Sequence, residues 1–207
     1  MGETAVKVVL LGNSAVGKTT LVTRWTEDRY DGSSQPTIGA AYKSVTLEFD
    51  DGKTYSMNIW DTAGQDEYRS TTSIYCRDAK AAMIVFDLTD RSSFEALDSW
   101  ISTLSEKVDV PFVIVGNKSD IGDRRAISFD DGAAFAERHQ VSYFETSALT
   151  NFNVDEAFNE LSNVAINFLN NGSSVQKEEP QEVAKSENQK VDLTKDQKKK
   201  KKSDCCK

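Results

Sequence analysis

Short apolar runs rich in β-branched residues alternate along the chain with segments of helical periodicity. Six runs predict strands, over residues 6–12, 42–49, 53–60, 81–88, 111–116 and 141–144. The turn-like sequence DDGK at 50–53 predicts that the second and third strands form an antiparallel hairpin. Helical segments separate the other strands, several of which are apolar throughout, so these strands are expected to be parallel with helices on both faces. The predicted fold class is therefore α/β, with a six-stranded, mostly parallel sheet and one antiparallel strand.

The last periodic segment is the clearest predicted helix. Apolar residues recur every three or four positions over 154–169, and the sequence Asn-Asn-Gly at 170–172 is expected to end the helix. The remaining chain has few apolar residues among Lys, Glu, Gln and Ser, too few for burial to offset the entropy cost of ordering. We therefore expect one domain over 1–170 and a flexible tail over 171–207.

Composition and charge restrict the class of function. The 207 residues are 38% hydrophobic and 9% aromatic, enough for a packed core. No run of about 18 apolar residues predicts a membrane span, and the apolar start is too short for a secretory signal. The net charge is −8, but residues 171–207 carry +3 and the body −11. Because phosphate neutralisation dominates nucleic-acid binding, the acidic body argues against nucleic acid as a partner.

A glycine-rich motif predicts a phosphate-binding loop. The sequence GNSAVGKT at 12–19 fits G-x-x-x-x-G-K-[ST] and lies directly between a predicted strand and a helix, as this motif requires. Backbone N–H groups and the positive end of the helix can surround phosphates there, while Lys18 reaches the β and γ phosphates and the Thr19 hydroxyl binds Mg²⁺. The alternative is a glycine-rich turn with a chance lysine. By itself the motif indicates only a nucleoside triphosphate.

Three further motifs follow predicted strands. In WDTAGQ at 60–65, the Asp can hold a Mg²⁺-bound water, the Gly N–H can meet a γ-phosphate, and the Gln can orient a water. NKSD at 117–120 and TSAL at 146–149 follow the fifth and sixth strands. The Asp of NKSD can accept hydrogen bonds from the N1–H and 2-amino groups of guanine, a donor pair that adenine lacks. Each motif alone could be an ordinary polar turn; their order after the phosphate loop favours the site.

In this order, GNSAVGKT, PTIG, WDTAGQ, NKSD and TSAL resemble the motifs of the Ras-like small GTPases over about residues 5–170. The sequences YRSTT, IYCRDA and IVFDLT, together with the tail, are similar to those of the Rab branch. PTIGAAY looks most like the early-endosomal Rabs, although Tyr42, Cys76 and Asp78 replace the usual Phe, Tyr and Gly. The resemblance implies a P-loop NTPase G domain that hydrolyses GTP slowly and is stimulated by a partner.

The resemblance also implies residue roles. Gln65 would position the attacking water and, with Lys18, form the catalytic pair. Mg²⁺ would be held by Thr19, Thr37 and, through water, Asp61. The residues expected to bind the nucleotide, GTP or GDP, are Ser14, Ala15, Val16, Gly17, Lys18, Thr19, Thr20, Thr37, Gly64, Asn117, Lys118, Asp120, Ser147, Ala148 and Leu149. Loss of the γ-phosphate would loosen segments of about 30–44 and 61–78.

Tyr42, Trp60 and Tyr75 match the aromatic triad by which Rabs bind effectors, although aromatics at strand ends more often pack in a core. Besides effectors, the implied partners are an exchange factor, a GTPase-activating protein, a GDP-dissociation inhibitor and an escort protein. Cys76 and His139 suggest no metal or nucleophile site and are interpreted as structural. The rival functions are another P-loop enzyme, such as an ATPase or nucleotide kinase, and an adaptor that is locked with GTP or independent of nucleotide.

Cys205 and Cys206 resemble the double-cysteine Rab ends that carry geranylgeranyl groups, and two such chains give stable anchoring. The lysines at 198–202 would add attraction to an anionic cytosolic leaflet; a nuclear-localisation signal or a solvated tail is the alternative. The protein is therefore expected on the cytoplasmic face of early endosomes, with a cytosolic GDP-bound pool, in tethering and fusion. The alternative is a Rab-like GTPase at another compartment of the secretory or endocytic pathway.

Overall fold

The computed structural model describes residues 4–30, 32, 35–49 and 52–171. The described strands are β1 (Thr4–Leu11), β2 (Ala40–Glu48), β3 (Thr54–Thr62), β4 (Ala81–Asp87), β5 (Phe112–Asn117) and β6 (Tyr143–Thr146). The α-helices are α1 (Lys18–Glu27), α2 (Arg69–Tyr75), α3 (Arg91–Glu95), α4 (Leu97–Ser105), α5 (Phe129–His139) and α6 (Val154–Asn171), and two short 3-10 helices are η1 (Asp66–Tyr68) and η2 (Gly122–Arg124).

The six strands form one sheet in the order β2-β3-β1-β4-β5-β6. Every neighbouring pair is parallel except β2 and β3, whose antiparallel register places Tyr42 opposite Trp60. At the hairpin turn, Gly52 adopts a positive φ of 74° and its N–H donates to the carbonyl of Phe49 over 2.9 Å. The predicted hairpin and the mostly parallel sheet are therefore confirmed.

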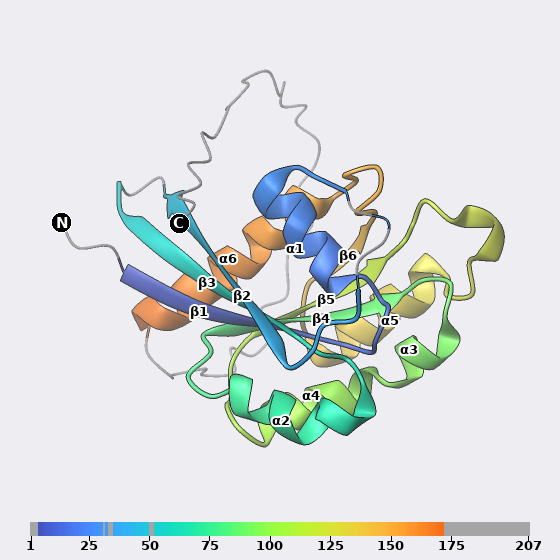
Figure 1. The fold of residues 1–207 in the computed structure, drawn as a ribbon, viewed down its shortest axis with the longest axis horizontal. Helices are drawn as coiled ribbons and strands as arrows, with labels where there is room; N and C mark the ends of the chain where they lie inside the picture. Colours follow the sequence, from blue (N-terminus) through green and yellow to red (C-terminus); the bar gives the residue numbers. More distant parts are fainter. Residues whose placement is uncertain (1–3, 31, 33–34, 50–51, 172–207) are drawn as a thin grey trace, which may run out of the picture.

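Helices α1 and α6 cover one face of the sheet, and α2 to α5 lie on the other (Figure 1). Because side chains alternate along a strand, Val8 and Leu10 of β1 pack towards α1 and α6, while Val9 and Leu11 pack towards the opposite helices. Each face thus has its own core, and the fold class predicted from the sequence is confirmed.

The end of α6 agrees with the prediction. The helix extends to Asn171, within the Asn-Asn-Gly sequence at 170–172 that is expected to end it. The Asn170 side-chain amide also donates to the Tyr55 hydroxyl of β3 over 3.4 Å, which ties the last turn to the sheet. Residues 172–207 lie outside the described residues. They include most of the predicted tail, with the lysines at 198–202 and both terminal cysteines. Within the described part, no helix has the length and apolarity needed to cross a membrane.

Replacing Phe158 by Leu is expected to lower the free energy of unfolding by about 2 kcal/mol. The Phe158 ring is buried on α6 and stacks on Trp25 of α1, with centroids 4.5 Å apart and planes 5° apart. The variant loses this stack and leaves part of the ring's volume empty. Denaturant unfolding at a fixed, saturating GDP concentration measures the change, because bound ligand itself adds stability.

Phe129→Leu is the matched control, since Phe129 is 57% exposed and should change the unfolding free energy by less than about 0.5 kcal/mol. Equal losses in the two variants would contradict the assignment of this stack to the core.

Candidate functional site

A cavity of about 260 Å³ opens where the loop after β1 turns into α1. Its walls are Ser14, Ala15, Gly17, Lys18, Thr19, Thr20, Tyr30, Gly32, Gln35, Pro36, Thr37, Thr62, Gly64 and Lys118. A smaller cavity of about 80 Å³ is lined by Gly17, Thr20, Tyr30, Asn117, Lys118, Asp120, Ile121, Ala148 and Leu149. Four residues line both cavities, so the two adjoin and form one elongated site.

The loop at 12–17 encloses the amino group of Lys18. Lys18 is 6% exposed, and its Nζ donates to the carbonyl oxygens of Gly12 over 2.7 Å and of Asn13 over 2.9 Å. Burial lowers the pKa of Lys18 to about 8, and the nearby Asp61 carboxylate only partly offsets this. A cation held in a dry, backbone-lined loop is suited to an anionic ligand such as a phosphate chain.

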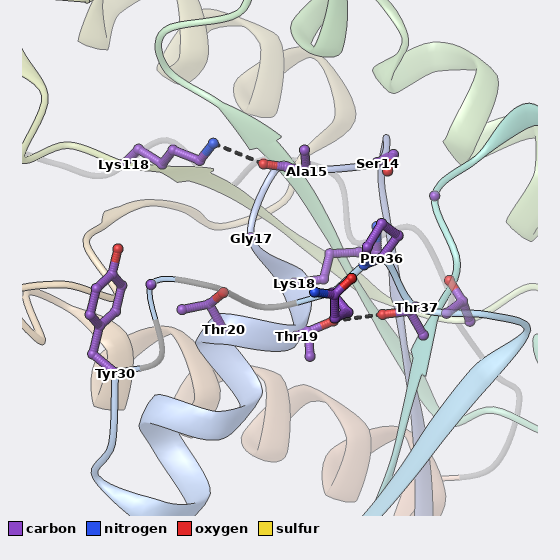
Figure 2. Close-up of a pocket in the computed structure, with 14 residues that line it drawn as sticks. Ser14, Ala15, Gly17, Lys18, Thr19, Thr20, Tyr30, Pro36, Thr37 and Lys118 are labelled. Carbon is purple, nitrogen blue, oxygen red and sulfur yellow. Dashed lines mark hydrogen bonds between the residues drawn. The ribbon is translucent and has the colours of Figure 1, made fainter.

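Two hydroxyls and a carboxylate meet beside this lysine. Thr19 Oγ1 donates to Asp61 Oδ2 over 2.6 Å. It also lies 2.8 Å from Thr37 Oγ1, a contact shown in Figure 2. The other carboxylate oxygen, Oδ1, is buried and has no hydrogen-bond partner among the described residues. Burial raises the pKa of Asp61, so its ionised form calls for a positive neighbour. Hard oxygen ligands of this kind fit Mg²⁺.

The loop after β3 lies directly against the phosphate loop. A Cβ added to Gly64 would lie 2.3 Å from the Asn13 carbonyl carbon and 2.4 Å from Ser14 N, so only glycine allows this approach. Gln65 follows as a half-buried residue outside both cavity walls, and its carbonyl accepts from Tyr68 N over 3.0 Å. The structure thus brings Gly64 to the site and leaves the Gln65 side chain beside it.

Gly64→Ala is expected to slow single-turnover GTP hydrolysis by about 100-fold, because the added methyl group must push this loop away from the phosphate loop. GDP affinity should change by less than about three-fold, since the phosphate loop keeps Lys18 and its carbonyl partners. Phosphate release from preloaded protein and GDP titration measure the two quantities.

Gly122→Ala is the control, because its added Cβ would meet nothing within 4 Å. A Gly64→Ala variant that hydrolyses GTP as fast as the parent would contradict the need for close contact.

Two side chains that line the smaller cavity also form hydrogen bonds to the phosphate loop. Asn117 Nδ2 donates to the carbonyl of Val16 over 2.9 Å, and its Oδ1 accepts from Thr146 Oγ1 over 3.2 Å. Lys118 Nζ donates to the carbonyl of Ala15 over 2.8 Å (Figure 2) and lies 2.6 Å from Asp87 Oδ2. Both residues therefore hold the loop as well as lining the smaller cavity.

Asp120 stands at the opposite wall of the smaller cavity. Its Oδ1 accepts from Ser147 Oγ over 2.6 Å, while Ala148 and Leu149 form the adjoining wall. Ser147 itself is buried and lies outside the walls, so it orients the carboxylate from behind. A fixed carboxylate in the wall of a cavity can accept two N–H groups from a planar base.

The aromatic residues 42, 60 and 75 form one cluster on the outer surface. The centroid of the Trp60 ring lies 5.5 Å from that of Tyr42 and 5.4 Å from that of Tyr75. Tyr42 is 53% exposed, and the neighbouring Ile38 and Ile74 are exposed as well. The core-packing alternative is therefore wrong for Tyr42, whereas Trp60 is partly buried and also packs against the core.

Cys76 and His139 pack against their neighbours, as interpreted from the sequence. The Cys76 thiol is fully buried, donates to the Thr72 carbonyl over 3.6 Å, and has its pKa raised to about 11 by burial. The His139 ring lies 4.8 Å from that of Phe135 and 3.5 Å from an Asp98 oxygen.

Sequence reasoning missed several residues of the site. Tyr30 lines both cavities, Gln35 and Thr62 line the larger one, and Asp87 pairs with Lys118. None of these residues was given a role by the sequence motifs, and some have side chains that are common in any loop. The Asp87 carboxylate, at the end of a fully buried strand, was the clearest missed signal.

Comparison with known proteins agrees with this arrangement. The sequence model that describes the Ras family matches residues 7–167 of this chain. The chain is 42% identical to Ras-related protein RABA4b of Arabidopsis thaliana over 166 residues, 79% of this chain and 74% of the relative. It is 43% identical to Ras-related protein Rab11C of Lotus japonicus over 154 residues, 73% of this chain and 71% of the relative. The chain belongs to the Ras family of small GTPases and to its Rab branch, and it binds guanine nucleotide and hydrolyses GTP.

Proposed function

We propose that this protein is a switch in vesicle trafficking that alternates between GTP-bound and GDP-bound forms at a compartment of the secretory or endocytic pathway. The observation that carries this proposal is the convergence of two separate loops on the phosphate loop. Thr37 reaches the Thr19 hydroxyl, and Gly64 touches the Asn13 backbone. Since both contacts surround one end of the larger cavity, a γ-phosphate there would hold both loops, and its loss would release them.

The residues divide into a phosphate end and a base end. Lys18 and the backbone of residues 14–20 bind the phosphates, while Gly64 approaches the γ-phosphate and Gln65 orients the attacking water. Asn117, Lys118, Asp120 and the 147–149 loop bind guanine. The hydrogen bond from Ser147 to Asp120 supports this, because it fixes one carboxylate oxygen and leaves the other for the base.

Thr19, Thr37 and, through water, Asp61 are the residues that would hold Mg²⁺. When bound, this ion neutralises charge on the β and γ phosphates. The unpaired, buried Asp61 Oδ1 supports the assignment. Within the chain, Asp61 keeps the Thr19 hydroxyl turned towards itself, and the two threonines bring the 35–39 segment over the site.

Tyr42, Trp60 and Tyr75 form the effector surface in this proposal. Tyr42 and Tyr75 lie in the two segments that would loosen after hydrolysis, and Trp60 lies between their rings on β3. The cluster can therefore hold its shape only while both segments stay in place. Exchange factor, GTPase-activating protein, GDP-dissociation inhibitor and escort protein complete the proposed partners.

The G domain ends near Asn171, and the tail anchors the protein to the cytosolic leaflet through lipid on Cys205 and Cys206, aided by the lysines at 198–202. RABA4b and Rab11C, named above, support a compartment other than the early endosome. We therefore favour a Rab-like GTPase at another compartment of the secretory or endocytic pathway over a role in early endocytic tethering.

The test follows N-terminally tagged full-length protein in cells with a briefly internalised fluid-phase dye. Label on membranes that exclude the dye is expected, and overlap with early dye-positive vesicles would restore the early-endosomal assignment. Replacing both terminal cysteines with serine should leave the label diffuse, whereas Cys76→Ser should not. Membrane label that survives loss of both terminal cysteines would defeat the lipid anchor.

A further inference from the structure

Arg24 of α1 contacts both the loop at 148–149 and the C-terminal end of its own helix. Its Nε donates to the Ala148 carbonyl over 2.8 Å, and its Nη2 donates to the Leu149 carbonyl over 3.3 Å. Its Nη1 donates to both the Asp28 carbonyl, over 3.1 Å, and the Asp28 carboxylate, over 3.2 Å. A guanidinium has five N–H donors in a rigid plane, so one side chain can satisfy acceptors on two sides at once.

The first pair of acceptors belongs to the wall of the smaller cavity. Ala148 and Leu149 line that cavity, and Ser147 just before them fixes Asp120. The bonds from Arg24 to these two carbonyls therefore fix the part of the wall formed by residues 148 and 149. Only 13% of the Arg24 side chain is exposed, whereas Asp28 is 85% exposed, and the bond to the Ala148 carbonyl is the best shielded of the four.

The second pair of acceptors lies where α1 ends. Asp28 adopts a left-handed conformation with φ of 49°, and the chain leaves the helix there towards Tyr30 and Thr37, both of which line the larger cavity. Arg24 thus joins the start of this segment to the base-side wall. The helix between Lys18 and Arg24 fixes the spacing of the phosphate end and this wall at about 9 Å along its axis.

We propose that Arg24 is a positioning residue that holds the base-side wall in place and thereby sets how long, and how selectively, guanine nucleotide stays bound. Its two bonds to Asp28 hold the guanidinium at the end of α1. Its two bonds to Ala148 and Leu149 then fix these wall residues relative to that helix. The inference rests on the proposed base-binding role of the smaller cavity.

The experiment compares release of GDP and of inosine diphosphate, which lacks the 2-amino group, from full-length parent, Arg24→Met and Arg91→Met proteins. Arg24→Met keeps the aliphatic stem and is expected to speed GDP release about ten-fold. The parent should release inosine diphosphate faster than GDP, and in Arg24→Met this ratio should shrink at least about three-fold, because the wall that presents Asp120 is no longer fixed. Arg91→Met, which removes an exposed ion pair with Glu95 on α3, should match the parent.

A general loss of stability would speed both releases equally, so an unchanged ratio in Arg24→Met overturns the inference at any absolute rate. Arg24→Lys keeps the charge and the stem, but its single ammonium cannot span both pairs of acceptors; it should resemble Arg24→Met, and parental rates there would also overturn the inference. If the parent itself does not discriminate between the two nucleotides, the proposed base site fails instead.

Discussion

Replacing Gln65 by Leu is expected to leave guanine nucleotide bound and to lower the stimulated rate of GTP hydrolysis by about 10⁴-fold. Stimulation in Ras is about 10⁵-fold, or roughly 7 kcal/mol of barrier, and a glutamine that orients the attacking water contributes to it. Leucine fills a similar volume but offers no donor or acceptor to a water. Binding should persist, because Gln65 lies outside both cavity walls, next to Gly64.

Phosphate release in a single turnover, alone and with a GTPase-activating protein that stimulates the parent, measures this effect. Bound nucleotide extracted from both proteins provides the control for loading. Equal stimulated rates in parent and variant would remove Gln65 from the reaction and direct attention to the Gly64 backbone and Lys18.

Asp120→Asn is expected to change the base preference from guanine to xanthine, with affinity for GTP falling by about 10³-fold. The Asp120 carboxylate accepts from Ser147 through Oδ1, and Asp120 lines the cavity that would hold the base. An amide offers one acceptor and one donor, so two N–H groups of guanine can no longer both be satisfied. Xanthine has a carbonyl at position 2, which can accept from that amide.

Competition between GTP and xanthosine triphosphate for one labelled nucleotide reports the preference directly. Asp123→Asn makes the same change three residues further on, in η2, outside both cavities, and should keep the parental preference. A variant Asp120→Asn that still prefers GTP would place base recognition elsewhere.

Most of the fold could be predicted from the sequence because the apolar periodicity that indicates each strand or helix lies within that element. Every predicted strand is present, although β2 and β3 extend to Ala40 and Thr62, two residues beyond the apolar pattern, since main-chain pairing continues there. The last helix also extends to Asn171, within the Asn-Asn-Gly sequence that was expected to end it.

The site was predicted as far as its motifs extend, and the structure brings the motif residues together around two adjoining cavities. Motifs could not predict contacts between residues that lie far apart in the sequence and belong to common residue types. Trp100 Nε1 donates to Asn13 Oδ1 over 2.8 Å across 87 positions, and Arg24 reaches Ala148 across 124. No local pattern distinguishes such a tryptophan or arginine from one that only packs or faces solvent.

The two bonds from Asn117 and Lys118 to the phosphate loop bear on the design of an engineered nucleotide specificity. Asn117 donates to the Val16 carbonyl, so any residue placed there alters the loop that binds phosphate as well as the wall that faces the base. Asp120 instead accepts a hydrogen bond from Ser147, which lies outside the phosphate loop. An orthogonal variant, loaded selectively with an unnatural nucleotide inside a cell, can therefore be built at Asp120 with phosphate affinity preserved, whereas at Asn117 selectivity and affinity would be lost together.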